Sequence, residues 1–111
     1  MIERMILNSL RSNGGASVNL AGNSPDHGFM VSREGSERVF DGYPNETDIH
    51  EYLASVDPRG AYIGTWFNPE NGKTYLDVSE NVQRATHARR LGKARKQISI
   101  YKVSTGDVIV L

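Results

Sequence analysis

The sequence predicts an α+β fold: one domain over residues 1–111, with a mainly antiparallel sheet of about five to seven short strands and two or three helices. Two segments repeat their apolar residues at helical spacing, and several short runs alternate apolar with polar residues. Asn71-Gly72, between two of these runs, is a strong signal for a hairpin turn. With 111 residues, 38% of them hydrophobic, the chain is long enough to bury one core.

Two segments have the apolar periodicity of an amphipathic helix. The first covers residues 2–12 and ends at Asn13-Gly14-Gly15. The second follows Thr47, which we expect to be its N-cap, and ends at Asp57-Pro58. Its apolar residues have the spacing i, i+3, i+4, i+7: Ile49, Tyr52, Leu53 and Val56. We expect both helices to pack on the sheet.

The remaining apolar runs predict strands. A short strand is expected within residues 16–20. Residues 28–32 and 37–40 are expected to pair as a hairpin through Glu34-Gly35-Ser36. Residues 61–67 and 73–78 form a second predicted hairpin. The last two strands fall in 98–103 and 108–111, with a turn at 104–107.

The hairpin of residues 61–78 has two different faces. A tight turn at Asn71-Gly72 would place Phe67 opposite Leu76 and Thr65 opposite Val78, on an apolar face; the alternative is a loop lengthened by Pro69. The other face combines aromatic and polar residues: Tyr62, Gly64, Trp66, Tyr75 and Asp77. Because leaving these aromatic side chains in water forgoes about 1.5–3 kcal/mol each, we expect the rest of the fold to cover this face. The alternative is a face exposed for a partner.

A third helix is expected after Ser79, which is a suitable N-cap. Small and apolar residues share one arc of this helix: Ala85, Ala88, Leu91 and Gly92. Cations share another: Arg89, Arg90, Lys93 and Lys96, with Arg84 and Arg95 flanking the packed side. A solvated surface is the ordinary explanation for such a charge run, and a binding face is the alternative.

The formal net charge of zero conceals a strong segregation of charge. Residues 21–58 contain eight acids and two arginines, and residues 81–97 contain six bases and no acid. These net charges of −6 and +6 can pair within the fold, between copies, or with an outside partner.

Several functional classes are excluded or disfavoured. The absence of cysteine excludes disulfides, thiolate catalysis and cysteine-ligated zinc. There is no apolar run of membrane-spanning length and no signal-peptide pattern, so we expect a cytoplasmic protein. No phosphate-binding loop, H-E-x-x-H or G-x-S-x-G motif is present, and we expect no cofactor, metal or catalytic activity. The enzyme alternative has two weak candidates: the pair Asp26-His27, and the set Asp77, Ser79 and His87.

Residues 60–109 carry a pattern of G-x-Y-x-G-x-W, then Y-L-D-V-S, A-x-x-L-G and Q-x-x-I-Y. The matching residues are Gly60, Tyr62, Gly64, Trp66, Tyr75, Leu76, Asp77, Val78, Ser79, Ala88, Leu91, Gly92, Gln97, Ile100 and Tyr101. This segment resembles small proteins, and parts of larger proteins, of actinobacterial phages and integrated elements. The resemblance implies a phage setting, in the cytoplasm of the host cell or in the virion, and implies no particular activity.

These observations favour a non-catalytic accessory protein that binds another protein, either a virion component or a host factor. An inhibitor of a host system is a special case. The residues expected to contact the partner are Arg84, Arg89, Arg90, Lys93, Lys96, Trp66, Tyr62 and Tyr75. The alternative is a nucleic-acid-binding protein that uses the basic helix 80–96, although the pI of 6.8 and the acidic segment argue against it.

Overall fold

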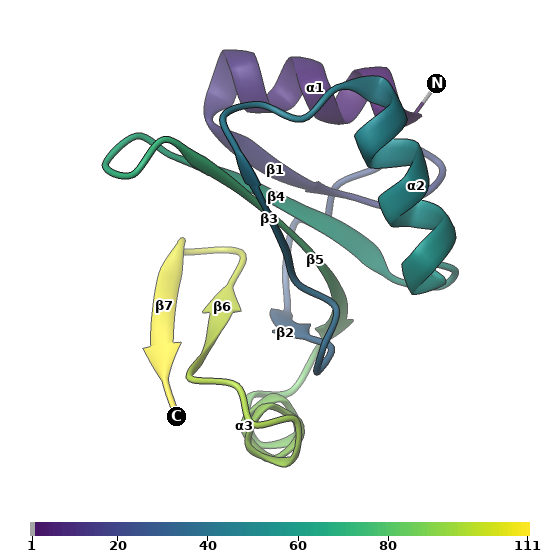
Figure 1. Ribbon diagram of the computed structural model, residues 1–111. Helices are drawn as coiled ribbons and strands as arrows, with labels where there is room; N and C mark the ends of the chain where they lie inside the picture. The colour runs from purple at the N-terminus through teal and green to yellow at the C-terminus, as the bar shows by residue number, and fades with distance from the viewer. Residues whose placement is uncertain (1) are drawn as a thin grey trace.

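The computed structural model describes residues 2–111 and contains three helices and one seven-stranded antiparallel sheet (Figure 1). The helices are α1 (Ile2–Asn13), α2 (Glu46–Val56) and α3 (Ala85–Ala94). The strands are β1 (Gly15–Val18), β2 (Phe29–Ser32), β3 (Arg38–Asp41), β4 (Tyr62–Asn68), β5 (Lys73–Val82), β6 (Ser99–Lys102) and β7 (Asp107–Val110). The predicted α+β fold class is confirmed.

β5 is the central strand of the sheet. β4 pairs along one edge of β5, while β3 and β2 pair end to end along the other edge, at Lys73–Leu76 and Ser79–Val82 respectively. The predicted hairpin between residues 28–32 and 37–40 is therefore wrong, because β2 and β3 run in the same direction and both pair with β5. Between them, the Ser36 hydroxyl accepts a hydrogen bond from the Val78 amide (3.1 Å), which keeps the edge of β5 occupied.

All three helices cover the same face of the sheet. Leu76 and Val78 of β5 belong to the larger core, under α1 and α2, and Val82 belongs to the smaller core, under α3. These residues alternate along β5, so their side chains point to one face. The larger core also contains Ile6, Leu10, Val18, Ile49, Tyr52, Ala61 and Ile63.

The register of the β4–β5 hairpin differs from the predicted one. Thr65 lies opposite Leu76 and Phe67 opposite Thr74, two residues away from the tight-turn register. The loop is longer because Asn68 pairs with Lys73, which leaves residues 69–72 outside the ladder. A shift of two residues preserves the side-chain alternation, so the predicted membership of each face is correct.

The N-caps of α2 and α3 also differ from the predictions. Asn45, rather than Thr47, caps α2: its side chain accepts from the Asp48 amide (2.8 Å), and the Asp48 carboxylate accepts from the Asn45 amide (3.0 Å). Ser79 caps no helix, because β5 continues to Val82. α3 instead begins after Arg84, which supplies no side-chain cap.

The two candidate caps of α2 provide a test of this assignment. Asn45→Ala should lower the free energy of unfolding by about 1 kcal/mol, because it removes one side of a reciprocal cap. Thr47→Ala, at an exposed position in the first turn two residues after the cap, should leave the free energy of unfolding unchanged or slightly higher. Urea denaturation of both variants measures this, and a larger loss for Thr47→Ala would contradict the assignment.

Candidate binding surfaces

The face of the sheet opposite the helices contains an open groove of about 1110 Å³. Its lining comes from the β4–β5 hairpin, from β1 and β2, and from the β6–β7 hairpin, which is drawn in yellow in Figure 1. Aromatic side chains lie on both sides: Trp66 and Tyr75 on the first hairpin, Tyr101 on the second. Both hairpins therefore contribute walls to this groove.

The aromatic side chains of the β4–β5 hairpin are not covered by another element. Trp66 is 53% exposed, and its ring stacks on that of Tyr75 with centroids 5.5 Å apart. Tyr62, further along the same face, is half-buried. The expectation that the fold covers this face is wrong, because all three helices pack on the opposite side. The Tyr75 ring covers part of the Trp66 ring from water, where a helix was expected to do so.

A carboxylate lies in the floor of the groove. Asp77 accepts a hydrogen bond from the Ser32 hydroxyl, which is 3.2 Å from the Ser79 hydroxyl. Burial raises the pKa of Asp77, although the hydroxyls of Ser32 and Ser79 act in the opposite direction by favouring the charged form. The groove thus combines exposed aromatic rings with one poorly solvated acid.

The basic residues of the third helix are mostly unpaired. Arg84, Arg89, Arg90 and Lys93, which we call the basic face of α3, are exposed and form no ion pair within residues 2–111. Lys96 lies beyond the end of α3, where its ammonium is 3.6 Å from Glu34. The side of α3 that faces the sheet contains buried Ala88 and Gly92 and half-buried Leu91, as predicted, whereas Ala85, which was predicted on the same arc, is exposed at the start of the helix.

The predicted flanking residue Arg95 has a structural role. Its guanidinium pairs with Glu80, and Arg33 approaches the same carboxylate at 3.6 Å. The hydrogen bond from Arg95 lowers the pKa of Glu80. Arg95 thus ties the end of α3 to β5.

The structure does not bring the basic face of α3 and the aromatic hairpin together. α3 packs on one face of the sheet, and Trp66 lies on the other. In Figure 1 the β4–β5 loop and α3 lie at opposite ends of the sheet. The residues that the sequence groups into one contact site therefore form two separate surfaces.

Sequence reasoning missed part of the groove. Tyr101 of β6 and Val108 of β7 lie opposite each other in the ladder and both line it, with exposures of 43% and 65%. The alternation along residues 98–111 identifies them as sharing one face. Nothing in the sequence indicates that this face turns toward Trp66.

The two enzyme candidates are not strengthened by the geometry. Asp77 and Ser79 share the groove, but His87 is on α3, which packs against the opposite face. Asp26 and His27 are in contact in an exposed loop, where the imidazole lowers the pKa of the carboxyl. Within residues 2–111 no cluster of three or more acids and histidines is arranged to hold a metal ion.

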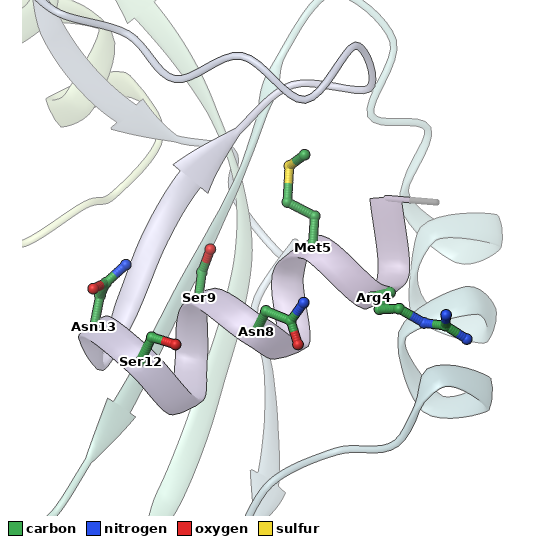
Figure 2. Close-up of a pocket in the computed structure, with 6 residues that line it drawn as sticks. All are labelled: Arg4, Met5, Asn8, Ser9, Ser12 and Asn13. Atoms are coloured by element: carbon green, nitrogen blue, oxygen red, sulfur yellow. The ribbon is translucent and has the colours of Figure 1, made fainter.

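A second, shallower hollow of about 440 Å³ runs along α1 (Figure 2). Figure 2 shows Met5 and Ser9 pointing to one side of the helix, while Arg4 extends toward α2. Arg4 pairs with Glu46 at 3.0 Å and is therefore already engaged. The rest of the lining is neutral: Met5, Asn8, Ser9, Ser12 and Asn13.

No family model, curated protein or solved structure matches this chain. Among residues 2–111, no helix combines the length and the apolar character needed to cross a membrane.

The raised pKa of Asp77 predicts a pH-dependent cost to the fold. Because the folded state holds this proton more tightly than the unfolded chain does, the carboxylate destabilises the fold as pH rises through the raised pKa. The free energy of unfolding of Asp77→Asn, relative to that of the parent, should thus increase from about pH 4 to about pH 7. Urea denaturation at both pH values measures the difference, and a difference that shrinks with rising pH would contradict the prediction.

Proposed function

We propose that this chain is a non-catalytic accessory protein, in a phage setting, that binds an acidic surface of another protein through the basic face of α3. The observation that carries the proposal is the unpaired state of these cations. The six other arginines each contact a carboxylate or an aromatic ring: Arg4, Arg11, Arg33, Arg38, Arg59 and Arg95. Within residues 2–111, the three arginines without such a contact all belong to the basic face of α3.

The basic face is unfavourable for the helix that carries it. Arg84 at the N-cap supplies no hydrogen bond and places a cation at the positive end of the helix dipole, with no acid in the first turn. Arg89 and Lys93 are like charges four residues apart, an arrangement that destabilises a helix by about 0.2–0.5 kcal/mol. These cations destabilise α3, and no contact of theirs within the described residues offsets this. Such an arrangement supports a role in recognition of a partner.

The arrangement on the helix suits a rigid contact. Ala88 and Gly92 are buried against the sheet, so the opposite side of α3 presents Arg89, Arg90 and Lys93 to solvent. Complementary charge raises the rate and specificity of association with an acidic partner. The setting, a virion component or a host factor as partner, rests on the resemblance of residues 60–109 to phage segments.

Reversal of two of these charges provides the test. Arg89→Glu with Lys93→Glu should reduce capture of a partner from phage-infected host cells at least about tenfold, because it turns attraction into repulsion. The matched control is Arg4→Glu with Arg59→Glu, which changes the net charge equally at exposed sites away from α3. Affinity purification with mass spectrometry measures capture, and circular dichroism checks the fold. Equal losses in both variants, or none in either, would contradict the proposal.

The same cations favour nucleic-acid binding as the second candidate. A helix with four unpaired cations can contact phosphates, and the affinity would fall steeply with salt. A gel shift with DNA and RNA at low salt, at micromolar protein, distinguishes the candidates. A shift that the α3 variant loses and the control retains would replace the protein partner with a nucleic acid.

A further inference from the structure

The groove on the opposite face of the sheet has features that the basic face of α3 does not explain. Asp77 forms no ion pair within residues 2–111, and no lysine or arginine lines the groove. We infer that this groove is a second binding site, which takes a lysine or arginine side chain of a partner polypeptide. The cation would pair with Asp77 and contact the rings of Trp66 and Tyr75.

Neighbouring residues hold the Asp77 carboxylate in the groove. Ser32 donates a hydrogen bond to it, and Gly64, directly opposite on β4, leaves the space that it occupies. A Cβ atom at residue 64 would come within 2.2 Å of Asp77 Oδ1. Gly64 is not required for a left-handed backbone conformation, so the carboxylate is the reason for a glycine here.

This arrangement is costly unless a ligand uses it. Glycine within a strand weakens the strand, and a partly desolvated carboxylate without a cation costs further stability. Close approach of a ligand is one of the situations in which strands contain glycine. The pairing of Asp77 with Gly64 therefore suits a preformed binding subsite better than a contact that stabilises the fold.

The aromatic pair lies beside the carboxylate. Trp66 and Tyr75 form the ladder pair two positions from Gly64 and Asp77, on the same face, or about 7 Å along the strands. The faces of tryptophan and tyrosine rings attract ammonium and guanidinium groups. One long cationic side chain can thus reach both the rings and the carboxylate.

Charge and size identify the occupant as part of a polypeptide. Apart from tyrosine, the ionisable residues that line the groove are Asp77 and Glu37, so the local charge favours a cation. At about 1110 Å³ the groove is much larger than one side chain. Its further walls offer apolar contacts to neighbouring residues of a bound segment: Met30, Tyr101, Val103 and Val108.

Trp66 is the only tryptophan, so its emission reports directly on the groove. Titration of the full chain with N-acetyl tetralysine amide should give a saturable change in emission, and tetraglutamate should give none. Asp77→Asn should weaken tetralysine binding at least about tenfold, the factor expected for one charged hydrogen bond. The matched control Glu37→Gln removes one charge at the rim and should change the affinity less than about threefold.

Four outcomes would overturn the inference. An absent or unsaturable response, or equal affinity in Asp77→Asn and the parent with both folded, would remove Asp77 as the cation site. Equal affinity for N-acetyl-lysine amide would replace the polypeptide with a small amine. An emission change on concentrating the protein alone, lost in Arg89→Glu with Lys93→Glu, would make a second copy the occupant. That same α3 variant should otherwise bind tetralysine normally, so this test is independent of the proposed function.

Discussion

The two faces of β5 determine the organisation of the molecule. Thr74, Leu76 and Val78 point into the larger core, while Tyr75, Asp77 and Ser79 point into the groove. Because alternation along a strand is strict, every helix that needs an apolar surface must pack on the first face. The second face is left without a helix, so Trp66 and Tyr101 are exposed to solvent there, whereas Asp77 is half-buried and Ser79 is buried.

The oppositely charged segments seen in the sequence are mostly not paired with each other. Acids of residues 21–58 pair with cations outside the basic segment, as in Glu46 with Arg4 and Asp57 with Arg59. Only Lys96 with Glu34 joins the acidic and basic segments directly among the ion pairs of residues 2–111. The positive charge of α3 therefore stays available, and it lies on the opposite side of the sheet from the groove that contains Asp77.

The sequence was sufficient for features that depend on local pattern. Apolar periodicity predicted α1 and α2, an arc of small residues predicted α3, and alternation predicted which residues of β4 and β5 share a face. Features that depend on competition between distant segments were missed. β2 and β3 are each good strands, but the longer β5 offers both of them an edge. Thr47 and Ser79 are suitable caps by residue type, yet Asn45 caps α2 and β5 extends through Ser79. The groove could not be predicted, because it forms between two hairpins whose relative placement leaves no local signal.

The order of strands in the sheet has a consequence for how the chain acquires its structure. Within residues 2–60, no strand pairs with another strand of the same segment: β1 pairs with β4, β3 with β5, and β2 with β5 and β6. During synthesis these three strands must therefore wait, with open hydrogen-bonding edges, until the ribosome releases residues 62–82. Such long-range pairing slows folding to roughly milliseconds or longer. Until then, the excess of acidic over basic residues in this N-terminal half favours its solubility.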